Sequence, residues 1–195
     1  DAESIVKGVF FMQKNRNKII KICLAAIFAA LYMVLDMLAI SLSANIKITF
    51  GGLPILLASF LLGPVYGAAA GTVGSFISQM LKYGFSATTV LWILPAAVRG
   101  ISAGLLFIAF KKRTKIIPLG ITIITSSILV TAFNTLAIYV DSVVNHYYSF
   151  VYVFGDTVWR VVSSLLSAIV YTAIILPLLK AIQKDKKLEI NRKNI

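Results

Sequence analysis

Long runs of apolar residues, separated by short polar segments, dominate the sequence. A helix needs roughly 20 mainly apolar residues to cross the hydrocarbon core of a bilayer. Four runs meet this length, over residues 19–40, 88–110, 116–140 and 155–179. Each of them predicts a transmembrane helix.

A further apolar stretch, between Gly52 and Leu81, is interrupted by Gly63-Pro64. Because proline lacks an amide donor and glycine is a poor helix former, this dipeptide predicts a tight turn between two shorter helices, over 49–62 and 65–81. The first is short for a full crossing, and a re-entrant segment is the alternative. Either way, the pattern predicts an all-α integral membrane bundle of six transmembrane helices.

The composition agrees with a chain whose solvent is lipid. Of the 195 residues, 59% are hydrophobic and 13% are charged, against roughly 45–50% and 25% in soluble domains. The single cysteine, Cys23, and the single histidine, His146, argue against a disulfide framework and a metal site. We expect no metal, no cofactor and no catalytic activity.

The basic residues predict the orientation in the membrane. The net charge of +12 would suit nucleic acid, but most cations gather at the ends of apolar segments, so we expect no nucleic-acid partner. Lysine and arginine are retained on the cytoplasmic side. Fifteen of the 19 basic residues fall in three groups that an even number of crossings places on one face: Lys7, Lys14, Arg16, Lys18 and Lys21; Lys111, Lys112, Arg113 and Lys115; Lys180, Lys184, Lys186, Lys187, Arg192 and Lys193.

Both termini are therefore predicted to be cytoplasmic in a multi-pass protein of the cell membrane. The expected organisation is a cytoplasmic N-terminal segment over 1–18, a six-helix membrane domain over 19–180 and a basic cytoplasmic tail over 181–195. The segments around 41–52, 82–87 and 141–154 are expected to be external loops.

Polar side chains inside the spans are costly in lipid, so each is a candidate for function. Arg99 is the strongest, because it lies near the middle of its span and no charged residue there neutralises it. Trp92 lies seven residues earlier on the same helical stripe. The other candidates lie toward the same outer end of the bundle or in its external loops: Asp36, Lys47, Gln79, Asn134 and Arg160.

These residues predict a binding cup that is open to the outside. A guanidinium beside an indole forms a stacking platform for a flat heterocycle, and amide side chains present paired donors and acceptors to its edge. Anionic ligand groups would suit Arg99, Arg160 or the external Lys47 and Lys82. Three alternatives stay open at this point. In the first, Arg160 forms an ordinary ion pair with Asp156 instead of binding a ligand. In the second, Trp92 belongs to an interfacial aromatic belt, and in the third, Asp36 pairs with one of the arginines as a structural contact.

Small residues form a second pattern. Glycines at 67 and 71 and at 100 and 104, four apart in each helix, let helix backbones approach closely in lipid. The first helix carries two overlapping pairs of alanines in its cytoplasmic half: Ala25 with Ala29, and Ala26 with Ala30. This face is a candidate docking surface for an external partner helix.

The sequence resembles the substrate-binding (S) components of energy-coupling factor (ECF) vitamin transporters over roughly residues 17–180. Three segments carry the resemblance to the family: Leu24-Ala25-Ala26-Ile27-Phe28-Ala29-Ala30-Leu31, Ile48-Thr49-Phe50-Gly51-Gly52-Leu53-Pro54 and Gly63-Pro64-Val65-Tyr66-Gly67. Within the family, the segment Leu91-Trp92-Ile93-Leu94-Pro95-Ala96-Ala97-Val98-Arg99-Gly100 is most similar to the folate-specific member.

The resemblance implies a protein that binds folate with high affinity from outside. It implies docking on a transmembrane coupling protein that carries two cytoplasmic ATPases, and delivery by reorientation of the whole S component in the bilayer. Ala25, Ala26, Ala29 and Ala30 match the family's docking positions. The alternatives are an S component for another flat vitamin, such as riboflavin or thiamin, and an outer-leaflet aspartyl hydrolase that uses Asp36 and Asp141.

Overall fold

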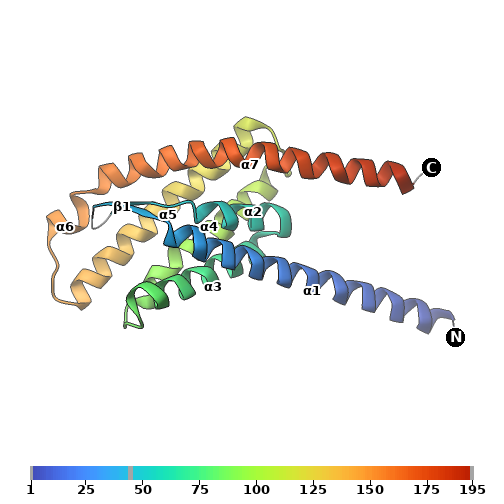
Figure 1. The fold of residues 1–195 in the computed structure, drawn as a ribbon, viewed down its shortest axis with the longest axis horizontal. Helices are drawn as coiled ribbons and strands as arrows, with labels where there is room; N and C mark the ends of the chain where they lie inside the picture. The colour runs from blue at the N-terminus through green and yellow to red at the C-terminus, as the bar shows by residue number, and fades with distance from the viewer. Residues whose placement is uncertain (1, 44–45, 194–195) are drawn as a thin grey trace.

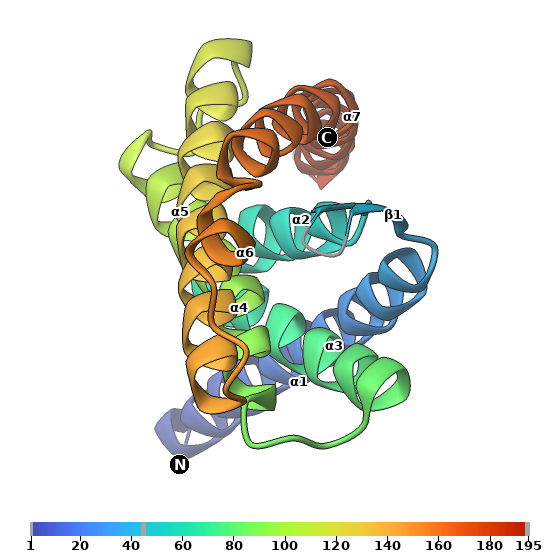
Figure 2. The ribbon, with the colours of Figure 1, turned by 90° about the vertical axis from the view of Figure 1, so that its left-hand side faces the viewer.

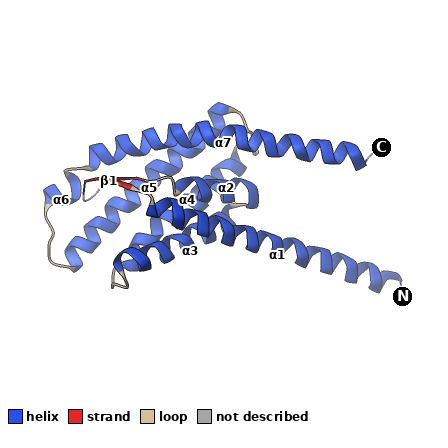
Figure 3. Ribbon diagram, viewed as in Figure 1, coloured by secondary structure: helices blue, strands red, loops and turns tan. Residues whose placement is uncertain are grey.

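The computed structural model describes the backbone of residues 2–43 and 46–193, and the side chains of residues 16–39 and 49–184. Helices make up most of this part of the chain (Figure 3). The elements follow in the order α1 (Ala2–Met37), β1 (Ile40–Ser43), β2 (Ile46–Ile48), α2 (Gly52–Leu62), α3 (Pro64–Tyr83), α4 (Thr89–Ala109), α5 (Ile116–Val144), α6 (Phe150–Phe154) and α7 (Thr157–Lys193).

The predicted all-α bundle is confirmed. The six helices expected from the apolar pattern correspond, within the described residues, to α1 to α5 and α7. Four segments are long and apolar enough to cross a membrane: Arg16–Met37, Thr89–Ala109, Ile116–Val144 and Phe150–Lys184. The turn predicted at Gly63-Pro64 separates α2 from α3, and Gly63 has a φ of 106°, which favours a residue without a Cβ.

Two small elements were not predicted. The expected loop around 41–52 contains a hairpin in which β1 pairs antiparallel with β2, with Ile40 opposite Ile48. Both strands alternate apolar and polar residues with a period of two, which is the pattern of a strand rather than of a loop. The expected loop at 141–154 contains the short helix α6.

Close helix contacts follow from the glycine pairs, as predicted. A Cβ added to Gly100 on α4 would lie 2.3 Å from the backbone nitrogen of Ala68 on α3, and one added to Gly104 would lie 2.6 Å from Cα of Pro64. On α3, the hydroxyl of Ser59 from α2 lies where a Cβ of Gly67 would be. These helices therefore pack backbone to backbone, which only glycine permits.

A buried apolar cluster holds α2, α4, α5 and α7 together. Its members include Leu56, Phe60, Phe107, Leu119, Ile123 and Ile175. Figure 2 shows α2 enclosed between α7 on one side and α1 and α3 on the other, in agreement with its contacts to all three. The N- and C-terminal ends of the chain lie at the same end of the molecule, and the hairpin and α6 lie at the opposite end (Figure 1).

Candidate ligand-binding site

A cavity of about 560 Å³ lies among the helix ends on the side of the hairpin and α6. Its volume falls within the range of small-molecule sites, about 300–1,000 Å³. Residues from α1 to α7 line it, together with loop residues between them. Six of the seven predicted ligand-binding residues line this cavity: Asp36, Gln79, Trp92, Arg99, Asn134 and Arg160. The seventh, Lys47, lies outside the residues whose side chains are described.

Arg99 and Trp92 both line the cavity from α4, and their spacing predicted that they share one face of this helix. The guanidinium carbon of Arg99 is 5.6 Å from the centroid of the Tyr171 ring on α7, a cation–π contact. At the start of α2, Gly52 leaves the space that the guanidinium uses, because a Cβ there would lie 2.1 Å from Nη1 of Arg99. The Tyr171 hydroxyl donates to the carbonyl oxygen of Thr49 at 2.6 Å. Arg99 is thus held at the cavity wall by an aromatic face.

Arg160, near the start of α7, is 7% exposed. Its Nη2 donates to the carbonyl oxygen of Val153 in α6 and to Oγ1 of Thr157, the latter at 3.0 Å. Nε and Nη1 are buried and have no hydrogen-bond partner among the described residues. Asp156, one turn earlier, interacts electrostatically with this arginine. A buried guanidinium with two unused donors is suited to an anionic acceptor.

Asp36, at the end of α1, pairs with a lysine rather than with either arginine. Lys82 on α3 donates to the Asp36 carboxylate at 2.6 Å and to its carbonyl oxygen at 2.7 Å. Ser78 donates to the same carboxylate oxygen at 2.5 Å, and Thr49 Oγ1 lies 3.5 Å from the other. These contacts tie the ends of α1 and α3 to the segment that leads into α2.

Asp141, near the end of α5, has its own polar partners. The amide of Asn145 donates to its carboxylate at 3.1 Å, and the Tyr147 hydroxyl donates to the other carboxylate oxygen. Burial and this hydrogen bond raise the pKa of Tyr147 above its ordinary value, so the hydroxyl stays protonated at neutral pH. Asp36 and Asp141 therefore lack the direct mutual contact expected of a coupled catalytic pair.

Sequence reasoning missed several cavity residues, and helical spacing could have found them. Ser163, Ser167 and Tyr171 follow Arg160 along α7 at intervals of three and four residues, so they share its stripe. Tyr32 precedes Asp36 by one turn on α1 and also lines the cavity. Serine and tyrosine are common in apolar helices, so only the alignment with a charged residue singles these out.

The predicted docking face on α1 divides into two. Ala25 and Ala29 are buried, at 7% and 3% exposed, and pack with Ala58 and Ala70 of α2 and α3. The other pair, Ala26 and Ala30, is exposed. Only the second pair is therefore free, within the described part of this chain, to meet an external helix.

Comparisons with known proteins identify a family and solved structures of similar fold. A family model described as "ECF transporter, substrate-specific component" matches residues 20–182. A structure titled "Structure and mechanism of the S component of a bacterial ECF transporter" is similar at a TM-score of 0.63 and 20% identity, over 86% of this chain and 98% of that one. ThiT from a Listeria monocytogenes serovar is similar at a TM-score of 0.66 and 19% identity, over 86% and 97%. The search of curated proteins found no match.

Proposed function

The chain belongs to the substrate-specific components of ECF transporters, and we propose that it captures folate outside the cell. Delivery follows when the protein, docked on a coupling protein with two cytoplasmic ATPases, reorients in the bilayer. The basic flanks support cytoplasmic termini. The cavity then faces outward, because it lies at the end of the bundle away from both termini.

The placement of positive charge supports an anionic ligand. The sequence has 19 basic residues, and four lie outside the three flanking groups. Three of these four, Lys82, Arg99 and Arg160, line the cavity. Lys82 is paired with Asp36, whereas neither arginine that lines the cavity has a salt bridge to a carboxylate among the described residues. Folate carries two carboxylates, whereas thiamin is a cation and riboflavin is neutral.

The observation that carries the proposal is the buried guanidinium of Arg160 with its two unused donors. Leaving such donors unsatisfied costs about 1–3 kcal/mol each, and more for a charged group. A carboxylate of the folate glutamate that accepts from one of these donors would remove part of this cost. The proposal therefore assigns the carboxylate end of folate to Arg160.

The cavity also offers groups for the pterin ring. Trp92 and the guanidinium of Arg99 present flat surfaces for stacking, and they share one face of α4. Gln79 and Asn134, from α3 and α5, bring amides that match the donor and acceptor edge of a pterin. Because these groups come from different helices, a flat ring and an anionic tail can be bound at the same time.

A direct test is the titration of the purified protein with folate, riboflavin and thiamin, followed by tryptophan fluorescence, together with the absorbance spectrum of any ligand that copurifies. We expect a pterin spectrum, and quenching by folate at concentrations at least a hundredfold below those of the other two vitamins. Tight binding of riboflavin or thiamin without folate would contradict the assignment and favour the other S components. Hydrolysis that is lost in Asp36→Asn, without any vitamin binding, would support the aspartyl hydrolase.

A further inference from the structure

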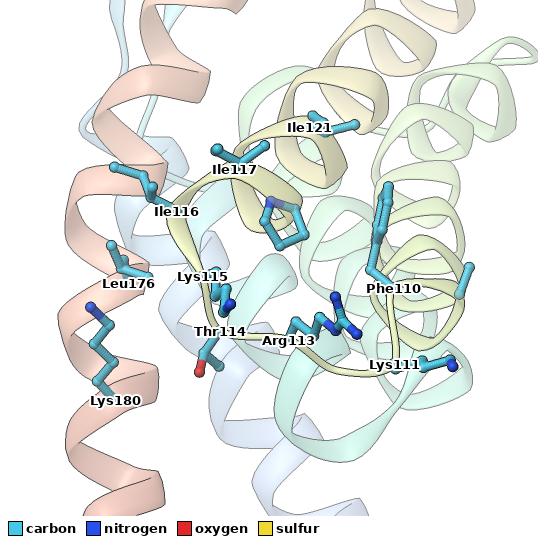
Figure 4. A pocket seen from close by; sticks show the side chains of 12 residues that line it. Phe110, Lys111, Arg113, Thr114, Lys115, Ile116, Ile117, Ile121, Leu176 and Lys180 are labelled. Atoms are coloured by element: carbon cyan, nitrogen blue, oxygen red, sulfur yellow. The ribbon is translucent and has the colours of Figure 1, made fainter.

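A second hollow lies at the other end of α4, away from the vitamin cavity. This groove has a volume of about 950 Å³ and runs between the α4–α5 loop and α7. Figure 4 shows Phe110 at the end of α4, Arg113 and Lys115 along the loop, and Leu176 and Lys180 on α7. The cavity residue nearest to it along α4 is Arg99. Arg99 is ten residues before Ala109, which separates them by about 15 Å of helix.

The groove combines cations with an apolar wall. Four basic residues line it, and no acidic side chain does among the described residues. Its wall includes Ile117 and Ile121, which are 71% and 46% exposed. Isoleucines this exposed would be unfavourable in water but not beside lipid acyl chains.

The loop that carries the cations has a defined conformation. Thr114 donates to the side-chain oxygen of Gln183 on α7 at 2.9 Å, which ties the loop to α7. The backbone of Lys111 and Lys112 is left-handed, with φ of 53° and 54°, and turns the chain sharply away from α4. The cations are therefore presented from a structured turn.

This loop joins two helices that are long and apolar enough to cross a membrane, which places it where the hydrocarbon core meets the headgroups. We propose that the groove binds one anionic phospholipid, with its phosphodiester against Arg113, Lys115 and Lys180 and an acyl chain along Ile117 and Ile121. Basic pockets between helix ends suit such headgroups, and each lysine or arginine near the surface adds attraction. The site is distinct from the vitamin cavity, and its existence does not depend on which vitamin is bound.

The test compares lipids on the purified full chain by native mass spectrometry. The probes are dioleoyl-phosphatidylglycerol, dioleoyl-phosphatidylcholine, and glycerophosphoglycerol, which has the anionic headgroup without acyl chains. The test variant is Arg113→Gln/Lys115→Gln. The matched control is Arg16→Gln/Lys18→Gln, which removes one arginine and one lysine from exposed positions on α1. Vitamin affinity, measured alongside, verifies that both variants are folded.

We expect phosphatidylglycerol to bind the parent protein at least tenfold more tightly than phosphatidylcholine. The affinity of the test variant for phosphatidylglycerol should fall tenfold or more, about 1.4 kcal/mol. The affinity of the control variant should stay within twofold of that of the parent protein. Equal binding of the two lipids, or an equal loss in both variants, would overturn the proposal. Competition by glycerophosphoglycerol at the same concentrations would show a headgroup site only. A test variant that keeps the lipid but no longer assembles with the coupling module would show a protein-docking surface instead.

Discussion

Lys82 on α3 and Asp36 on α1 form a salt bridge of 2.6 Å in the wall of the candidate binding cavity. Both side chains are largely covered, at 24% and 19% exposed, and Ser78 donates to the same carboxylate oxygen. The pair joins the last turns of two helices that converge on the cavity. It therefore acts as a structural contact that shapes the site.

The first prediction concerns this pair. Asp36→Asn and Lys82→Met should each lower stability in detergent by about 1–2 kcal/mol, because each leaves the other group without its charged partner. The double variant should cost little more than either single one, since the interaction can be lost only once. Thermal unfolding of the four proteins measures this coupling. Fully additive losses would show that the two residues act independently.

A second prediction concerns the contact between α3 and α4. Gly100→Ala would place a Cβ 2.3 Å from the backbone nitrogen of Ala68, so the helices must separate. The expected loss is about 1–3 kcal/mol. Gly120→Ala is the matched control on α5, because its Cβ would meet only Cγ2 of Thr172, at 4.0 Å. Unfolding curves for the two variants should differ clearly, and coinciding curves would refute the proposed close contact.

Tyr171 allows its ring and its hydroxyl to be tested separately. Tyr171→Phe keeps the ring beside Arg99 and loses the hydrogen bond to Thr49, whereas Tyr171→Leu loses both. We expect Tyr171→Leu to weaken folate binding several-fold more than Tyr171→Phe, because only the leucine leaves the guanidinium without an aromatic face. Fluorescence titration measures both affinities. If Tyr171→Phe weakened folate binding more than Tyr171→Leu, the hydroxyl rather than the ring would be the group that supports binding.

The divided alanine face of α1 gives a fourth prediction. Ala26→Trp adds bulk to an exposed position and should leave folate binding intact while abolishing uptake by the assembled transporter. Ala25→Trp adds it inside the packed contact with α2 and α3, so it should reduce stability as well as binding. Binding assays in detergent and uptake assays in vesicles separate the two effects. Normal uptake by Ala26→Trp would show that partner docking does not use this position.

Helical periodicity made much of the site predictable, because the residues that converge lie at intervals of three, four or seven along their own helices. Trp92 and Arg99 illustrate this, since both line the cavity from one stripe of α4. Contacts between distant elements could not be read in the same way. The Asp36–Lys82 pair joins residues 46 apart, and the sequence pattern suggested only Arg99 and Arg160 as partners of Asp36.

Short elements limited the prediction in another respect. The carbonyl of Val153 that binds Arg160 belongs to α6, which is too short for an apolar period to reveal. The two alanine pairs of α1 are shifted by one residue, about 100° around a helix. Composition could not tell which pair faces the bundle, because that depends on where α2 and α3 pack.

The most direct test of the central claim, that one cavity binds a flat ring and an anionic tail together, compares Arg160→Gln with the parent protein on two ligands. Folate has both parts, and 6-methylpterin has the ring without carboxylates. Titration by fluorescence should show folate binding weakened tenfold or more, about 1.4 kcal/mol, and 6-methylpterin binding unchanged within twofold. Unchanged folate affinity, or an equal loss for both ligands, would contradict the claim.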